Sequence, residues 1–242
     1  METIKKVDNY EIKRIYDDFG NEIRTLYTGS SHQSITYTNE KKFELYDKHT
    51  LLFDICANDD DDQKVLVLGG GCFSYPKYYI SHYKTKTMDV VEIDKKMIDI
   101  AREFFYLDEL YEKYDKFKQR LKIYCEDAFL FINKQNKKYD SIFIDLFIDK
   151  MPIKEVYEDN NLKKIQDLIN NNGIIVINYI IDNNEESKTT YKTNINQLKK
   201  YFEFVNIYAI PEYKERRYGN VLIICSKNKK KYMFKTPIVE LV

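Results

Sequence analysis

The feature that most constrains the fold is a run of three glycines that directly follows an apolar segment, in residues 64–79, KVLVLGGGCFSYPKYY. The chain has only seven glycines in 242 residues, and Gly69, Gly70 and Gly71 stand together at one point. The preceding residues, VLVL, predict a buried strand, and the residues after the glycines can start a helix. Glycine reaches positive φ without steric cost and lets a backbone approach a ligand closely. The run therefore indicates a ligand-binding turn between a strand and a helix, with a merely tight turn as the alternative.

Downstream of this turn, strand-like and helix-like segments alternate along the chain. The pattern predicts strands in the segments TMDVVEID, LKIYCED, YDSIFIDLF, IIVINYII, FVNIYAI and NVLIICS. Between them it predicts helices over 95–105, around 129–132, through Leu162, Ile165 and Ile169, and through Tyr191, Ile195, Leu198 and Phe202. Such alternation is typical of a parallel sheet with helices on both faces. Only residues 211–219 join the last two strands, too few for a crossover helix, so we expect these strands to pair antiparallel.

The first 42 residues show a different pattern, without helices. The segments YEIKRIYD and NEIRTLYT alternate roughly with period two, and Gly20 and Asn21 supply a turn between them. SHQSITYT is a third candidate strand, and the apolar spacing over residues 43–56 is mostly helical. The sequence thus predicts a small N-terminal β-strand domain over residues 1–42, followed by a Rossmann-like α/β domain over residues 43–242.

The charge balance and the cysteines exclude several classes of protein. Lys plus Arg and Asp plus Glu are both 39, which argues against general nucleic-acid binding because affinity for phosphates needs a basic surplus. No apolar stretch approaches the roughly 18 residues that span a bilayer, and no signal-peptide pattern opens the chain. Cys56, Cys72, Cys125 and Cys225 are scattered, without metal-ligand spacing. We therefore expect a cytoplasmic protein with no metal site and no membrane or nucleic-acid partner.

Acidic residues stand at the ends of three of the predicted strands. Glu92 ends the second strand of the α/β domain, Asp127 the third and Asp145 the fourth. Because ligands of open α/β sheets bind at the carboxyl ends of the strands, we expect these side chains to meet beside the glycine turn. Glu92 stands where a carboxylate binds ribose hydroxyls, whereas Asp94 is placed to cap the helix that follows it. Asp127 can accept a hydrogen bond from an adenine amino group or cap a helix of its own.

The residues after the glycines separate the possible ligands. A phosphate-binding P-loop needs Gly-Lys-Ser/Thr at its end, whereas this turn continues with Cys72, Phe73 and Ser74. The dinucleotide fingerprint needs glycine or alanine at the position of Ser74, so the match to an NAD site is incomplete. A carboxylate at the position of Glu92 serves both NAD and adenosyl nucleosides, so both ligands stay open on these residues.

In these motifs the sequence resembles the spermidine synthase (polyamine aminopropyltransferase) family over nearly its whole length. The segments VLVLGGG, VVEID, CEDAFLF and YDSIFID match the family's motifs in order and spacing, and HQS and ELYDKHTLL match its N-terminal part. The resemblance implies a Rossmann-like methyltransferase sheet, mostly parallel with an antiparallel C-terminal hairpin, and a small N-terminal β-domain. It also implies transfer of an aminopropyl group from decarboxylated S-adenosylmethionine to a small-molecule amine, with a second copy of the chain as partner in a homodimer.

The resemblance also assigns roles to individual residues. Asp145 would be the catalytic carboxylate, which attracts the protonated amine and accepts its proton. Tyr46 would wall the amine site, and Asp149 would stand in for a second carboxylate, one residue later than in the family. The residues expected to contact the donor are Gln33, Gly69, Gly70, Gly71, Cys72, Glu92, Asp127 and Ala128, with Asp127 at the adenine end.

The sequence departs from the family's pattern at Cys72. The family has an acidic residue directly after the glycines, which faces the amine of the decarboxylated donor and repels the carboxylate of ordinary S-adenosylmethionine. Cys72 removes both effects, so methyl transfer from ordinary S-adenosylmethionine is the second hypothesis. An NAD-dependent oxidoreductase and a non-catalytic nucleoside-binding protein are further alternatives. The identity of the acceptor stays open.

Overall fold

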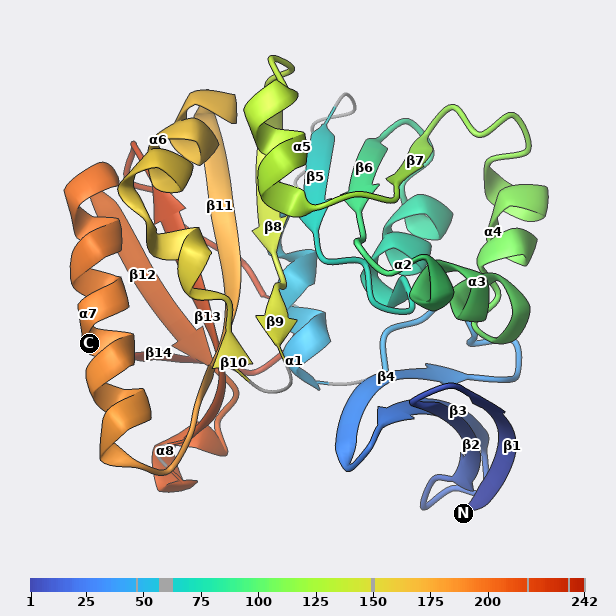
Figure 1. Ribbon diagram of the computed structural model, residues 1–242. Helices are drawn as coiled ribbons and strands as arrows, with labels where there is room; N and C mark the ends of the chain where they lie inside the picture. Colours follow the sequence, from blue (N-terminus) through green and yellow to red (C-terminus); the bar gives the residue numbers. More distant parts are fainter. Residues whose placement is uncertain (47, 57–62, 149–150, 217, 235, 242) are drawn as a thin grey trace.

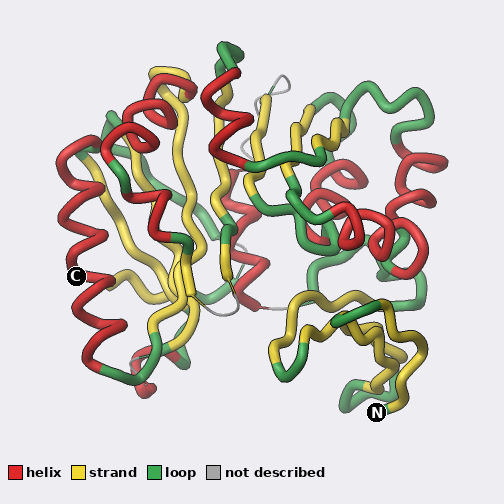
Figure 2. Tube along the Cα trace, viewed as in Figure 1, coloured by secondary structure: helices red, strands yellow, loops and turns green. Residues whose placement is uncertain are grey.

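The computed structural model describes residues 1–46, 48–56, 63–148, 151–216, 218–234 and 236–241. A four-stranded sheet, an eight-stranded sheet and a two-stranded hairpin form the frame of the described chain (Figures 1 and 2). The small sheet has the strand order β1-β2-β3-β4, and the large sheet has the order β14-β12-β13-β11-β8-β5-β6-β7.

The parallel half of the large sheet consists of strands that are almost entirely apolar. Its members are β5 (Lys64–Leu68), β6 (Thr87–Val91), β7 (Leu121–Tyr124) and β8 (Tyr139–Ile144). Every residue of β5 after the first is buried, because helices cover both faces of the sheet. The parallel pairing expected for these segments is confirmed.

The other half of the large sheet is mainly antiparallel. β11 (Ile169–Ile181) pairs parallel with β8 and antiparallel with β13 (Gly219–Ser226). β13 also pairs antiparallel with β12 (Phe204–Ala209), whose other side carries the short strand β14 (Val239–Leu241). β13 therefore lies between β11 and β12, and the antiparallel pairing predicted for the last two segments is confirmed.

Helices pack on the two faces of the large sheet in two apolar cores (Figure 1). One core contains α2 (Ser74–His82), α3 (Lys95–Phe104) and α4 (Leu107–Tyr114), and the other contains α5 (Ala128–Lys134), α6 (Asp159–Leu168) and α7 (Glu185–Tyr201). The short elements are α1 (Lys48–Leu51), η1 (Leu52–Cys56), β9 (Phe147–Ile148), β10 (Met151–Pro152), η2 (Lys154–Tyr157) and α8 (Tyr213–Arg216).

The small N-terminal sheet consists of β1 (Glu2–Val7), β2 (Tyr10–Tyr16), β3 (Glu22–Thr28) and β4 (Ser31–Tyr37), all paired antiparallel. The sequence predicted the last three strands and missed β1, most of whose side chains are exposed, so the apolar signal of a buried strand is weak there. The division into domains over residues 1–42 and 43–242 stays a prediction.

A buried lysine connects the small sheet to the large domain. Lys77 of α2 donates from Nζ to Thr36 Oγ1 in β4 (3.3 Å) and to the carbonyl oxygen of Phe105 after α3 (2.6 Å). Its side chain is 1% exposed, and these two partners are a hydroxyl and a carbonyl rather than a carboxylate. Burial lowers the pKa of Lys77 to about 7, because the charged form loses its hydration.

Two helix predictions differ from the structure, and one helix was not predicted. Ile169, predicted on a helix, is the first residue of β11, and its extended backbone ends α6. Residues 43–56 are helical only from Lys48 onward, in α1 and η1, and α4 was not predicted. Among the helices of the described residues, none combines the length and the hydropathy needed to cross a bilayer.

Candidate functional site

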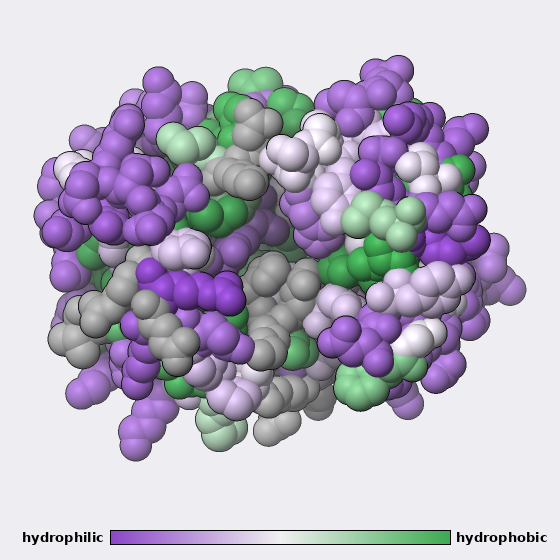
Figure 3. Space-filling view, turned by 90° about the horizontal axis from the view of Figure 1, so that it is seen from below, coloured by the Kyte–Doolittle hydropathy of each residue, from purple (hydrophilic) through white to green (hydrophobic). Residues whose placement is uncertain are grey.

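A cavity of about 750 Å³ opens at the carboxyl ends of the parallel strands. Its walls come from β4, from the turns after β5, β6, β7 and β8, and from β11 and β13. Figure 3 views this side of the molecule and shows the surface hollowed near its centre. This is the place where open α/β sheets bind their ligands.

Packing within the protein requires glycine at two positions of the turn after β5, without any ligand. Gly69 has φ +92°, and a Cβ there would lie 2.2 Å from the carbonyl oxygen of Asp145. A Cβ on Gly70 would press against neighbouring side chains at 3.0 Å. Gly71 has φ +50° and more room, since its nearest neighbour is Ser34 Oγ at 3.4 Å. All three glycines line the cavity, but packing within the protein is sufficient to explain Gly69 and Gly70.

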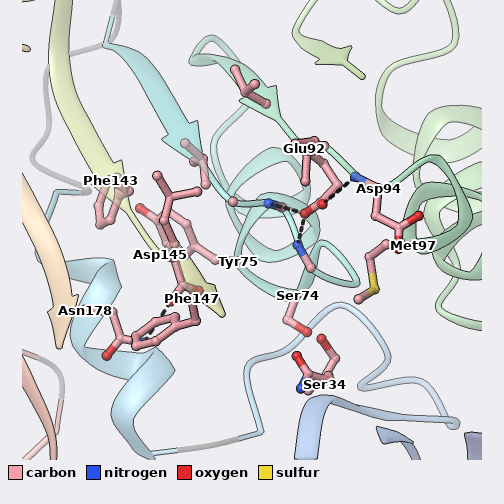
Figure 4. A pocket seen from close by; sticks show the side chains of 18 of the residues that line it. Ser34, Ser74, Tyr75, Glu92, Asp94, Met97, Phe143, Asp145, Phe147 and Asn178 are labelled. Atoms are coloured by element: carbon pink, nitrogen blue, oxygen red, sulfur yellow. Dashed lines mark hydrogen bonds between the residues drawn. The ribbon is translucent and has the colours of Figure 1, made fainter. Parts of the chain in front are cut away.

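Glu92 holds the glycine turn through the backbone (Figure 4). Its Oε2 accepts hydrogen bonds from the N–H groups of Gly70 (2.9 Å) and Gly71 (3.0 Å), and its Oε1 accepts one from the N–H of Asp94 (2.9 Å). Burial raises the pKa of Glu92, and the three N–H groups offset part of this increase. The sequence assigned Glu92 to ribose alone, whereas the structure adds a role in fixing the turn.

The two aspartates that can cap helices do so. Asp94 Oδ1 accepts from the N–H of Lys96 at the start of α3 (2.8 Å), and its Oδ2 accepts from the hydroxyl of Tyr10 (2.6 Å). Asp127 Oδ1 accepts from two N–H groups at the start of α5, at 2.8 and 2.9 Å. The capping alternative for Asp127 is therefore observed, and its adenine contact stays a prediction. Asp127 and Ala128 both line the cavity.

The N-terminal part of the chain supplies one wall of the cavity. Gln33 lies exposed on β4, and the half-buried Tyr46 has its ring centroid 5.0 Å from that of Tyr37. Both Gln33 and Tyr46 line the cavity, whereas the donor contact of Gln33 and the amine contact of Tyr46 stay predictions. Ser34 Oγ accepts a hydrogen bond from the N–H of Cys72 (3.1 Å), which ties this wall to the glycine turn.

Asp145, which directly follows β8, lies at the other end of the cavity (Figure 4). Its Oδ1 accepts a hydrogen bond from Nδ2 of Asn178 (2.8 Å), and Asn178 Oδ1 accepts one from Nδ2 of Asn220 (3.0 Å). The sequence analysis missed both asparagines. A signal for Asn178 was present in the sequence, because the segment IIVINYII contains only apolar residues besides this asparagine and a tyrosine. The aromatic residues that line the cavity near Asp145 are Phe53, Tyr75, Phe143 and Phe147.

The structure does not support the expected contact between Cys72 and the donor. Cys72 is 1% exposed, its Sγ lies 3.6 Å from Sδ of Met97, and it is absent from the residues that line the cavity. The side chain packs into the core beneath the turn, and burial raises the pKa of its thiol to about 12. A core position also explains why a small apolar residue stands there. Asp149 lies outside the described residues, so its role stays a prediction.

The charge of the cavity is strongly one-sided. Its acidic lining residues are Glu92, Asp94, Glu126, Asp127 and Asp145. Among the described residues, no lysine or arginine lines the cavity, and His32 is the only residue there that can carry a positive charge. Within the same described part of the chain, no cluster of three or more His, Cys, Asp or Glu residues is placed to hold a metal ion. Such a lining favours cationic ligands, because carboxylates attract them and no basic group repels them.

Known proteins resemble this chain in both sequence and fold. A family model described as the spermine/spermidine synthase domain matches residues 47–236. A polyamine aminopropyltransferase from Methanocaldococcus jannaschii is 31% identical over 114 residues, which cover 47% of this chain and 38% of that protein. A polyamine aminopropyltransferase from Clostridioides difficile is 27% identical over 204 residues, covering 81% and 66%. The chain therefore spans less than two thirds of the length of these relatives.

A solved structure extends the comparison to the fold. The crystal structure of a probable spermidine synthase from Corynebacterium glutamicum has a TM-score of 0.77, at 18% identity, and covers 96% of this chain and 82% of that one. At this identity the likeness bears on the fold alone. It confirms the predicted α/β class, a mostly parallel methyltransferase-type sheet with antiparallel C-terminal strands and a small N-terminal β-sheet.

Proposed function

The chain belongs to the spermine/spermidine synthase domain family, and on that premise we propose that it is a transferase that uses an adenosyl sulfonium donor. The donor in this proposal is decarboxylated S-adenosylmethionine, the group that moves is aminopropyl, and the acceptor is a small amine. The observation that carries the proposal is the cavity lining, with five carboxylates and, among the described residues, no lysine or arginine. A sulfonium donor and an ammonium acceptor are both cations, so this lining favours both reactants.

The same lining disfavours the anionic alternatives. The pyrophosphate of NAD would meet carboxylates instead of the N–H groups of a complete dinucleotide motif. The five carboxylates of the lining would also repel the carboxylate of ordinary S-adenosylmethionine. Cys72 takes no part in this repulsion, because it does not line the cavity. Aminopropyl transfer is therefore preferred to methyl transfer on charge.

We assign the nucleoside of the donor to the end of the cavity beside the glycine turn. Glu92 has four lone-pair sites on its carboxylate, and three of them accept backbone N–H groups. The fourth is available for a ribose hydroxyl. Gln33 and Gly71 would contact the donor from the two sides, and Asp127 with Ala128 would border the adenine.

We assign the acceptor amine to the end beside Asp145. The amine nitrogen attacks the methylene carbon next to the sulfonium, a C–N bond forms, and the C–S bond breaks with its electron pair on sulfur. Methylthioadenosine leaves, and Asp145 accepts the proton that the ammonium loses. Tyr46 and the aromatic side chains around Asp145 hold the carbon chain of the amine, which aligns nitrogen, carbon and sulfur.

The experiment that tests this proposal measures methylthioadenosine release from decarboxylated S-adenosylmethionine with a panel of linear monoamines and diamines. Wild-type protein should release it in an amine-dependent manner. Asp145→Asn keeps the shape but loses the proton acceptor, so kcat should fall by about 100-fold or more while the Kd for methylthioadenosine stays within about twofold. Asp99→Asn, an exposed change on α3, is the control. An Asp145→Asn protein as active as the wild type would contradict the mechanism.

The other candidate functions have outcomes of their own in the same set of measurements. Methylated product from ordinary S-adenosylmethionine, with the decarboxylated donor inert, would establish the methyltransferase instead. Calorimetric binding of NAD without binding of methylthioadenosine would favour the oxidoreductase. Nucleoside binding without turnover of either donor would leave a binding protein. The homodimer is a separate proposal, which light scattering of the purified protein decides.

A further inference from the structure

Three side chains from neighbouring strands form a hydrogen-bonded row at the Asp145 end of the cavity. Asp145 follows β8, Asn178 lies in β11 and Asn220 lies in β13, and in the sheet β11 stands between β8 and β13. Asn220 Nδ2 donates to Asn178 Oδ1 (3.0 Å), and Asn178 Nδ2 donates to Asp145 Oδ1 (2.8 Å). All three residues line the cavity, and Figure 4 shows the bond between Asn178 and Asp145.

The hydrogen bonds of the row can run in only one direction, from Asn220 through Asn178 to Asp145. An ionised carboxylate accepts hydrogen bonds and donates none, so Asn178 must present its NH₂ group to Asp145. The carbonyl oxygen of Asn178 then faces Asn220, which donates to it. If the amide of Asn178 were turned by 180°, its oxygen would face the carboxylate, and its NH₂ would face the NH₂ of Asn220. The carboxylate of Asp145 therefore sets the orientation of Asn178, and the hydrogen bond from Asn220 Nδ2 to Asn178 Oδ1 holds the Asn178 amide in that orientation.

We propose that Asn178 and Asn220 are positioning residues, which fix the plane of the Asp145 carboxylate and keep it ionised for the incoming amine. This inference rests on the proposed function, in which Asp145 receives the proton. A hydrogen bond donated to a carboxylate favours its charged form. The same bond restricts rotation of the carboxylate, so its orientation toward the amine is set before the amine binds. Asn220 acts through Asn178, because its hydrogen bond goes to Asn178 and not to Asp145.

Other groups in the cavity also act on Asp145, and the experiment must hold them constant. Tyr75 from α2 lies beside Asp145 in Figure 4. The remaining titratable residues of the lining, besides the bonded pair Tyr10 and Asp94, are His32, Tyr46, Glu92, Glu126 and Asp127. None of them changes in the variants below, so their effect on the pKa of Asp145 is common to all of the proteins compared.

The first measurement is a ¹³C NMR titration of the aspartate carboxyl groups, with Asp145→Asn used to identify the Asp145 signal. Asn178→Leu keeps the branching and the number of side-chain heavy atoms but has no donor, so the proton affinity of Asp145 should rise about tenfold, the equivalent of one pKa unit. Asn220→Leu leaves the donor in place but removes its fixed orientation, so the rise should be about threefold. The double variant should match Asn178→Leu alone, because in the proposal Asn220 acts on Asp145 through Asn178.

Asn206→Leu is the matched control, an asparagine of β12 that donates to Glu240 and lies outside the cavity lining. It should leave the Asp145 titration unchanged. If Asn178→Leu does not fold, Asn220→Leu alone still tests the proposal, because it leaves the row's central residue in place. A purely structural role for Asn220 would lower the stability of the fold without moving this titration.

The second measurement is the pH dependence of kcat/KM for aminopropyl transfer. Its acidic limb should move to higher pH in Asn178→Leu and, by less, in Asn220→Leu, while the KM for the donor stays unchanged. If the wild type transfers no group and the titration still shifts as expected, the proposed function is wrong and the row is supported. If transfer proceeds but the Asp145 titration ignores Asn220, or if the two substitutions act additively, the positioning proposal is overturned.

Discussion

At the end of the cavity that we propose for the nucleoside (the nucleoside end) an acidic side chain is held by backbone N–H groups, whereas at the end that we propose for the amine (the amine end) an acidic side chain is held by another side chain. Glu92 accepts hydrogen bonds from the N–H groups of Gly70, Gly71 and Asp94. Asp145 accepts one from Asn178, which is oriented in turn by Asn220. Glu92 follows β6 and Asp145 follows β8, the two parallel strands that flank β5, so the same sheet edge supports two different ways of fixing a charge.

The difference determines how each end responds to substitution. Backbone N–H groups are present whatever the side chains are, so the nucleoside end depends on the shape of the turn and on the glycines that permit it. Side-chain donors exist only if particular residues are present, so the amine end depends on the identity of two asparagines. Substitutions at the nucleoside end should therefore lower the stability of the fold, whereas substitutions at the amine end should lower the rate of transfer.

The largest expected effect tests the turn itself. Gly69→Ala places a Cβ 2.2 Å from the carbonyl oxygen of Asp145, at a φ that alanine rarely adopts. The free energy of unfolding, measured with urea, should fall by about 3–4 kcal/mol from strain and overpacking together. Gly71→Ala is the matched control, because its nearest neighbour is 3.4 Å away, and it should lose about 1–2 kcal/mol. Equal losses at the two positions would show that the approach to Asp145 is not what requires glycine.

The next effect tests the carboxylate that holds the turn. Glu92→Ala leaves three backbone N–H groups without their acceptor and removes the proposed ribose contact. The affinity for methylthioadenosine, measured by calorimetry, should fall by about 1–3 kcal/mol, or roughly 5-fold to 150-fold. Asp99→Ala, on the exposed side of α3, is the control. An unchanged dissociation constant for Glu92→Ala would remove Glu92 from the nucleoside site.

The smallest effect concerns Lys77, the buried residue of α2 that donates to Thr36 in β4. The pKa of Lys77 is about 7 in the folded protein and has an ordinary value of 10.5, so between these pH values the unfolded chain binds more protons. The free energy of unfolding of the wild type should therefore rise with pH through this interval. Lys77→Met should lack this contribution, because methionine does not bind a proton. The free energy of unfolding of Lys77→Met, relative to that of the wild type, should be highest at pH 7 and below. This difference should fall by about 1 kcal/mol between pH 7 and 8.

Thermal unfolding of both proteins across this pH range checks the prediction. Lys122→Met, at an exposed position of β7, is the control for removal of a lysine charge. A stability difference between Lys77→Met and the wild type that does not vary with pH would mean that Lys77 keeps its proton in the folded state.

The sequence predicted the backbone-held end better than the side-chain-held end, for a physical reason. A strand, a glycine turn and an acidic residue at the next strand end are local patterns, and they located Gly69 and Glu92 correctly beside the cavity. Asn220 meets Asn178 only because β13 pairs with β11, a contact between residues 42 positions apart in the chain. No local pattern indicates such a contact, so the row could not be foreseen.

Two errors have the same origin. Cys72 was placed against the donor because it follows the glycines, but the direction of its side chain depends on the turn's geometry, which carries it into the core. Ile169 continues the apolar spacing of α6, and the same residue is also the buried start of β11. Apolar spacing cannot distinguish these two roles, because both require a buried isoleucine.

The position of β13 also affects how the molecule reaches its folded state. β11 and β12 precede β13 in the chain, yet each pairs with β13 rather than with the other. Until β13 joins them, each of these strands has an unpaired edge, which exposes the folding chain to misassociation. Asn220 arrives on that same strand, so an intermediate without β13 can form the glycine turn but leaves Asn178 without its orienting partner. We expect nucleoside binding to appear earlier than transfer activity during refolding.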